Sequence, residues 1–163
     1  MEPRPPSQSF SVISSWMGPT DAGGAGNVHG GTIMRLCDEV AGIAAIRHSA
    51  CRVVTAGMDR MTFLHPVYLG DLLTVRACVN AAWRTSMEVG VRVESENVRT
   101  GETVHTSTAY LTMVALDDHG RPTPVPPLTP ETPDEIRRQR EAELRRGNRL
   151  AEREHIMQGR EDE

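Results

Sequence analysis

Hydrophobic and polar residues follow two different periods along this chain. From residue 32 to residue 48 apolar side chains recur on nearly every side of a helical projection, which predicts a helix. Downstream, apolar and polar residues alternate, as is typical of half-buried antiparallel strands. The alternation predicts strands over 51–59, 72–83, 86–98 and 104–116, and a short strand around Phe10, Val12 and Ile13, ending at Trp16, precedes the helix.

The order of these elements predicts an α+β fold. Hairpin-length links at 84–85 and 99–102 join consecutive strands, so the sheet is expected to be antiparallel. A helix that is apolar all round has to be buried, and Thr32 is its expected N-cap after a glycine-rich loop. We therefore predict a single domain over residues 8–119, in which one layer of antiparallel sheet wraps around one central helix.

The C-terminal quarter of the chain differs in composition from this domain. Residues 120–133 contain six prolines and are expected to be extended, neither helical nor part of a central sheet. Residues 134–163 form a charged, helix-prone tail. Two alternatives remain for this tail: a solvated segment, or a helix that packs through a thin apolar seam of Ile136, Leu144 and Leu150.

Composition excludes several classes of function. The net charge is -4 and aromatic residues make up only 4% of the chain, which argues against nucleic acid as a partner. No apolar run approaches the ~20 residues needed to cross a bilayer, and the N-terminus lacks the apolar core of a signal peptide. Three scattered cysteines favour a reducing compartment, so we expect a cytoplasmic protein without a membrane partner.

The common catalytic motifs are absent from the sequence. There is no GxxxxGK[ST], HExxH or GxSxG motif, and the six histidines lack metal-ligand spacing. The glycines at 23–26 lack the GxGxxG spacing of a dinucleotide site. We therefore expect no metal and no nucleotide cofactor.

Two adjacent acids in the middle of the most hydrophobic helix stand out. A buried carboxylate without a partner costs several kcal/mol, so each acid needs a partner, solvent or a function. Glu39 lies four residues after Arg35, a spacing that favours an ion pair on the helix surface. Asp38 has no free basic residue at such a spacing, so it is either a solvated edge residue or a functional one.

The loop before this helix holds a second group of candidates. Residues Asn27, His29, Gly30 and Gly31 lead into the helix N-terminus, where free backbone N–H groups favour an oxygen that gains negative charge. The loop is therefore a candidate oxyanion site. Alternatively, Asn27 only caps or turns the loop, as asparagine often does.

Several motifs, in the same order, resemble one known family. They are Asn27-Val-His-Gly-Gly-Thr-Ile-Met34, Asp38-Glu39, Ala41-Gly42, Met58-Asp59 with Phe63, Pro66-Val67, Gly70-Asp71, Arg84-Thr85-Ser86-Met87-Glu88-Val89, and Val114-Ala115-Leu116-Asp117 before the proline-rich segment. Over residues 8–150 the chain is similar to the cytosolic, brain-type acyl-CoA hydrolases of the hotdog superfamily. The HGG-helix-Asp element alone also resembles phenylacetate-type thioesterases.

This resemblance implies a function and a set of site residues. It implies a hotdog domain that hydrolyses acyl-CoA, with Asn27 and Asp38 as the catalytic residues and coenzyme A as part of the substrate rather than a cofactor. Asp38 would act as general base or as nucleophile. Arg84, Thr85 and Ser86 would contact coenzyme A, unless they form an ordinary polar hairpin. The resemblance also implies a homo-oligomer, a dimer unit in a trimer of dimers, in which two chains build each site.

Two other functions stay open at this point. One is a thioesterase for aryl-CoA substrates of the phenylacetyl type. The other is an acyl-CoA-binding regulator without turnover, against which the intact pair of Asn27 and Asp38 counts.

Overall fold

The computed structural model describes residues 1–161, so the last two residues of the expected 134–163 tail lie outside the described residues. Two short 3-10 helices, η1 and η2, flank the first strand. The elements in chain order are η1 (Pro6–Ser9), β1 (Ser11–Trp16), η2 (Pro19–Asp21), α1 (Gly30–Ser49), β2 (Arg52–Met58), β3 (Thr62–Phe63), β4 (Leu72–Ala82), β5 (Ser86–Asn97), β6 (Glu102–Leu116) and α2 (Pro133–Glu161). The predicted helix and strands are confirmed, with ends that differ from the prediction by one or two residues.

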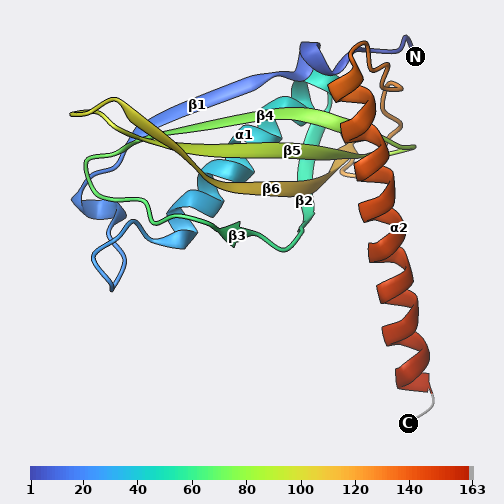
Figure 1. Ribbon diagram of the computed structural model, residues 1–163. Helices are drawn as coiled ribbons and strands as arrows, with labels where there is room; N and C mark the ends of the chain where they lie inside the picture. Colours follow the sequence, from blue (N-terminus) through green and yellow to red (C-terminus); the bar gives the residue numbers. More distant parts are fainter. Residues whose placement is uncertain (162–163) are drawn as a thin grey trace.

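One antiparallel sheet curls around α1 (Figure 1). Its strand order is β1-β4-β5-β6-β2, and the short β3 pairs with β6 beside β2. The register places Val75 opposite Val93, so the alternating valines of neighbouring strands share one face. That face packs on α1 and forms the core. The predicted α+β architecture of one sheet layer around one helix is confirmed.

The start of α1 is one turn earlier than its predicted cap. The residue at the N-cap is His29, whose Nδ1 accepts a hydrogen bond from the Gly31 N–H at 2.9 Å, so the expectation that Thr32 caps the helix is wrong. At the other end Ala50 adopts a left-handed conformation with φ of 57°, and its N–H donates to the Ile46 carbonyl. A left-handed residue is a common helix end, although this position is more often glycine than alanine.

The helix is not covered on every side within one chain. Val40, Ala41 and Ala44 are fully buried against the sheet. On the opposite side Met34 is 42% exposed, Ile43 39% and Ile46 48%. The expectation of burial all round is therefore wrong for the single chain, because the curled sheet covers only one side of α1.

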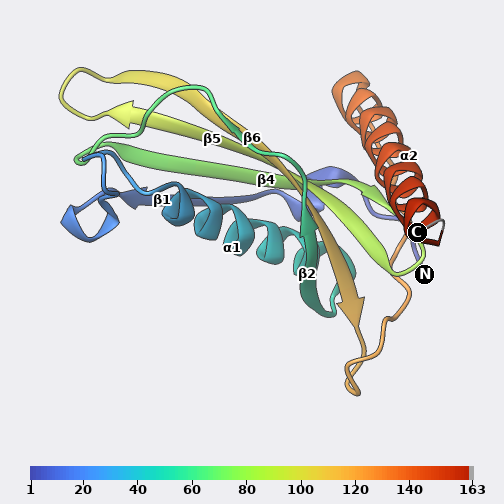
Figure 2. The ribbon, with the colours of Figure 1, turned by 90° about the horizontal axis from the view of Figure 1, so that it is seen from below.

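The C-terminal helix α2 packs on the other face of the sheet from α1 (Figure 2). The contact is not the predicted apolar seam, since Leu144 is 65% exposed and Leu150 53%. Instead Ala142 is buried against the sheet, and Arg145 reaches the fully buried Glu88 of β5 with an Nη2–Oε1 distance of 2.7 Å. The helix is held by a buried ion pair that apolar periodicity does not reveal.

The proline-rich residues 121–132 contain no helix or strand and lie along the body of the fold. Val125 is buried in the core, and Leu128 forms an isolated parallel bridge with Arg4. The Arg4 guanidinium also donates to the carbonyl of His48 at the end of α1. Within residues 1–161, neither long helix combines the length and apolarity needed to cross a membrane.

Candidate active site

Asp38 lies on the side of α1 that the sheet leaves uncovered. Its carboxylate Oδ1 accepts a hydrogen bond from the Oγ1 hydroxyl of Thr55 in β2, and both side chains are exposed. The same hydroxyl lies 3.6 Å from the Met113 sulfur. A carboxylate held at one oxygen by a hydroxyl, on an apolar helix face, is oriented while its other oxygen stays available.

The neighbouring acid behaves as the sequence predicts. Glu39 pairs with Arg35, with 2.6 Å between Oε1 and Nη1, so this i,i+4 prediction is confirmed. Both side chains are exposed to solvent, so the ion pair contributes little to the stability of the fold. Asp38 is therefore the acid on this helix face that no cation neutralises among the described residues.

The cysteine next to Asp38 can be excluded as a nucleophile. Cys37 is fully buried, and burial, with a smaller contribution from the Asp38 charge, raises the pKa of its thiol to about 12. Only a thiolate attacks a thioester efficiently, and a thiol with this pKa stays protonated at neutral pH. A metal site is also unsupported: among residues 1–161 no three His, Cys, Asp or Glu side chains converge closely enough to hold an ion.

The loop before α1 is fixed by backbone hydrogen bonds. The Gly23 N–H donates to the Asn27 carbonyl at 2.6 Å, and the Val28 N–H donates to the Val67 carbonyl at 2.8 Å. The half-buried Asn27 side chain makes no hydrogen bond with any described residue. Gly26, rather than Asn27, adopts the left-handed backbone conformation that the turn needs, with φ of +84°. The Asn27 amide is therefore not occupied by a cap or turn contact.

Among the glycines at the helix start, one amide is open. The Gly31 N–H is used by His29 Nδ1, and the Thr32 N–H donates to the His29 carbonyl. The Gly30 N–H has no partner among the residues that the structure describes. A Cβ at Gly30 would lie 3.5 Å from the Phe63 ring, so the glycine lets this ring lie close to the helix start. Of His29, Gly30 and Gly31, only Gly30 offers a free backbone donor.

The structure does not bring Asn27 and Asp38 together within one chain. Asp38 lies eight residues after Gly30, which corresponds to a rise of about 12 Å along the helix axis. Asp38 faces β2, whereas Asn27 lies in the loop that precedes the helix start. One chain therefore offers the two groups at separate positions.

Arg84 and Thr85 lie in the turn between β4 and β5, and Ser86 is the first residue of β5. The Trp83 N–H donates to the Ser86 carbonyl at 2.8 Å, and the carbonyls of Thr85 and Arg84 accept from Ala115 and from Val125. The Arg84 side chain is exposed and has no ion-pair partner among the described residues. This turn lies at the opposite end of β4 from the loop that carries Asn27 (Figure 1), so one chain does not join these two groups either.

Comparisons with known proteins identify the family. A model of the thioesterase superfamily matches residues 25–102. Protein VdlD of Helicobacter pylori is 42% identical over 127 residues, which cover 78% of this chain and 72% of VdlD. The uncharacterized acyl-CoA thioester hydrolase YkhA of Bacillus subtilis, another relative, is 40% identical over 129 residues, which cover 79% of this chain and 75% of YkhA. The chain belongs to the thioesterase superfamily.

Other relatives confirm the resemblance found in the motifs and the hotdog fold. The cytosolic acyl coenzyme A thioester hydrolase of Rattus norvegicus is 38% identical over 139 residues, which cover 84% of this chain but only 36% of the longer rat protein. A solved apo-hexameric acyl-CoA thioesterase superposes with a TM-score of 0.90 at 37% identity, covering 93% of this chain and 97% of that chain. The curled sheet around α1 is therefore a hotdog thioesterase fold.

Proposed function

We propose that this thioesterase superfamily member hydrolyses acyl-CoA to a carboxylic acid and free coenzyme A. The observation that carries the proposal is the Asp38 carboxylate, held by Thr55 on an open apolar helix face. The names of the relatives support the same reaction. A relative from Staphylococcus aureus, an acyl-CoA hydrolase 35% identical to this chain, has been solved with butyryl coenzyme A and coenzyme A.

In this proposal Asp38 starts the reaction in one of two ways. As a general base it takes a proton from water, whose oxygen attacks the thioester carbonyl. As a nucleophile it attacks the carbonyl itself, expels the thiolate of coenzyme A and forms an anhydride that water then cleaves. In both cases the C–S bond breaks and the thiolate takes up a proton. The Gly30 N–H is the donor suited to the carbonyl oxygen as it gains negative charge.

Thr55 is the residue that sequence patterns did not predict, and a spacing supports its role. Solved variants of the Staphylococcus aureus hydrolase replace one asparagine, one aspartate and one threonine by alanine. The aspartate precedes the threonine there by seventeen positions, as Asp38 precedes Thr55 here. The asparagine precedes the aspartate there by fifteen positions and Asn27 precedes Asp38 by eleven, so the role of Asn27 stays a prediction.

The uncovered face of α1 supports a site built by two chains. The uncovered side of α1 exposes Met34, one turn before Asp38, and Ile43 and Ile46 further along the helix. Apolar side chains exposed on an uncovered helix face are typical of a protein interface. A second chain placed there could bring its own loop with Asn27 and Gly30 to Asp38. Hexameric relatives support a trimer of such dimers, and a cytosolic relative supports a cytoplasmic location.

Release of free thiol from acyl-CoA tests the proposed reaction. The Asp38→Asn variant keeps the shape of the side chain and should lose at least about 100-fold in kcat/KM, the low end for loss of a general base. Glu39→Gln is the matched control, because the Glu39 carboxylate pairs with Arg35 alone among residues 1–161. Normal turnover by Asp38→Asn would contradict the proposal.

A single turnover in ¹⁸O-labelled water tests whether Asp38 is a nucleophile whose own acyl carbon is attacked by water. If Asp38 is a general base, or if water attacks the substrate carbon of the anhydride, the label enters the acid product directly. If Asp38 is a nucleophile and water attacks the Asp38 acyl carbon, one ¹⁸O atom enters the Asp38 carboxylate instead, and mass spectrometry of the peptide that contains Asp38 detects it.

A further inference from the structure

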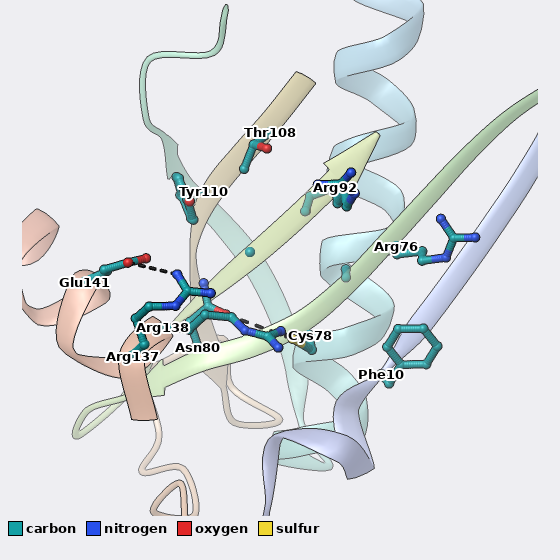
Figure 3. A pocket seen from close by; sticks show the side chains of 13 residues that line it. Phe10, Arg76, Cys78, Asn80, Arg92, Thr108, Tyr110, Arg137, Arg138 and Glu141 are labelled. Atoms are coloured by element: carbon teal, nitrogen blue, oxygen red, sulfur yellow. Dashed lines mark hydrogen bonds and ion pairs between the residues drawn. The ribbon is translucent and has the colours of Figure 1, made fainter. Parts of the chain in front are cut away.

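A pocket lies on the outer face of the sheet, away from α1. It occupies about 380 Å³ between the outer side of β4–β6 and the first turns of α2. Figure 3 shows Arg137 and Arg138 of α2 on one side, with Arg76, Arg92 and Phe10 across from them. Asp38 lies on the opposite side of the same sheet, so we call this space the outer-face pocket to distinguish it from the candidate active site.

Three of the four arginines that line the outer-face pocket have carboxylate partners. Arg76 and Arg92 share the Glu94 carboxylate. Nη1 of Arg76 lies 2.5 Å from Oε2, and Nε of Arg92 lies 2.8 Å from Oε1. Arg137 pairs with Glu141 at 2.9 Å. The charge of these three side chains is therefore compensated in part, and Glu94 serves two guanidinium groups at once.

Arg138 differs from the other three because no carboxylate lies within ion-pair distance of it among residues 1–161. Its Nη1 donates to the Cys78 sulfur at 3.4 Å, a weak and neutral acceptor. Burial, the largest cause, raises the pKa of the Cys78 thiol, so the sulfur does not supply a negative charge at neutral pH. Of the two acids three residues away, Glu141 pairs with Arg137, and Glu135 accepts hydrogen bonds from the backbone N–H groups of Glu131 and Thr132.

The half-buried guanidinium of Arg138 has N–H donors without partners among the described residues, so it is suited to bind an anion. Its planar fork matches phosphate oxygens, and Arg137 beside it adds a second cation. The pocket is larger than a phosphate ion and falls in the size range of small-molecule sites. Phe10, about half exposed, adds aromatic surface and Thr108 a polar group, whereas Arg145 stacks on the Tyr110 ring and the buried Asn80 donates to Glu88. These features match a phosphate group attached to a flat ring.

We propose that the outer-face pocket binds a phosphate-bearing ligand the size of a nucleotide, with its phosphate on Arg138 and Arg137. The ligand would bridge α2 and the sheet, and its binding should therefore stabilise the docking of α2. It would leave Asp38 of the same chain free, because the two sites lie on opposite faces of the sheet. The proposal does not depend on acyl-CoA hydrolysis, and the phosphates can come from a free nucleotide or from the nucleotide end of coenzyme A.

Calorimetric titration of the full chain with ATP, pyrophosphate, adenosine 3′,5′-bisphosphate and adenosine tests this proposal. We expect at least one phosphate-bearing compound to bind, adenosine alone to bind at least tenfold more weakly, and affinity to fall as salt is raised. Binding of ATP or pyrophosphate assigns the site to free phosphates or nucleotides. Binding of the 3′,5′-bisphosphate but not ATP assigns it to the end of coenzyme A.

Arg138→Gln should weaken this binding at least tenfold, and Arg138→Lys by less, since the charge remains but the fork is lost. Arg140→Gln is the matched control, because Arg140 is exposed on the same helix and does not line the pocket. Melting curves without ligand verify that each variant folds. The proposal is overturned if no phosphate compound binds the wild type, or if Arg138→Gln binds as tightly as Arg140→Gln.

Discussion

Replacing Arg145 by methionine tests how α2 is fastened to the sheet. The Arg145 guanidinium donates to both oxygens of Glu88, at 2.7 Å from Nη2 to Oε1 and 3.1 Å from Nε to Oε2. Glu88 is fully buried, and the guanidinium also stacks on the Tyr110 ring at 3.6 Å. Methionine keeps the length and apolar contacts of the side chain but leaves the Glu88 carboxylate without its main partner.

The cost of this change follows from the burial of Glu88. Removing one partner of a buried ion pair costs about 3–5 kcal/mol. Arg149 at 3.5 Å and Asn80 at 3.3 Å still touch the Glu88 carboxylate, so the low end, about 3 kcal/mol, applies. At roughly 2–4 °C per kcal/mol for a chain of this size, the melting temperature should fall by about 6–12 °C.

Thermal melts at one fixed protein concentration measure this difference. Arg146→Met is the control, because Arg146 stacks on Trp83 at 4.3 Å and forms no ion pair among residues 1–161. Its replacement should cost about 1 kcal/mol or less. The double change Glu88→Met with Arg145→Met should recover most of the loss, since an apolar pair replaces a buried ionic one at little cost. A melting temperature within about 2 °C of wild type for Arg145→Met would refute this account of α2 docking.

Three further changes have definite expected outcomes. Thr55→Val removes the hydroxyl that holds Asp38 and should lower kcat about tenfold or more in the thiol-release assay with little change in melting temperature; an unchanged kcat would exclude this positioning role. Gly90→Ala places a Cβ against the buried side chain of Asn80 and should cost about 1–3 kcal/mol in denaturant unfolding, whereas an unchanged midpoint would mean that the strand adjusts freely. Burial, the largest cause, lowers the pKa of His48, so the unfolded chain binds more protons and stability should fall as pH drops below about 6.5. Denaturation at several pH values should show a smaller fall for His48→Gln, and an equal fall would contradict this assignment.

The sequence pattern predicts the main elements well because the core is built from regular alternation. Strands β4, β5 and β6 each place every second residue against α1, and that period is visible in the chain. The pair of Arg35 and Glu39 is equally local, since four residues separate its partners. Contacts inside one element or between neighbouring strands can therefore be predicted from spacing.

Contacts between distant segments could not be predicted in the same way. Thr55 reaches Asp38 from another element, and neither spacing nor hydrophobicity marks it. Arg145 meets Glu88 across 57 residues, in a helix whose larger apolar residues Leu144 and Leu150 are exposed. The cap of α1 was missed because a histidine ring, an uncommon cap, accepts the Gly31 N–H in place of a threonine. The side chains that surround Asp38 in a dimer also lie beyond what one chain determines.

Subunit complementation is the most direct test of hydrolysis at a site shared by two chains. Asn27→Ala and Asp38→Ala are made separately, and each homo-oligomer should be nearly inactive in the thiol-release assay. In a mixed dimer one shared site carries both changes and the other carries neither. Mixing under subunit exchange should therefore restore up to about a quarter of wild-type activity, since half the dimers are mixed and half of their sites are intact.

Native mass spectrometry first establishes that mixed dimers form. Given mixed dimers, recovery of activity is the result that we predict. If Asn27 and Asp38 acted within one chain, every site would carry one change and mixing would restore nothing. Persistent inactivity of the mixed dimers, or full activity of the Asn27→Ala protein alone, would contradict the shared site.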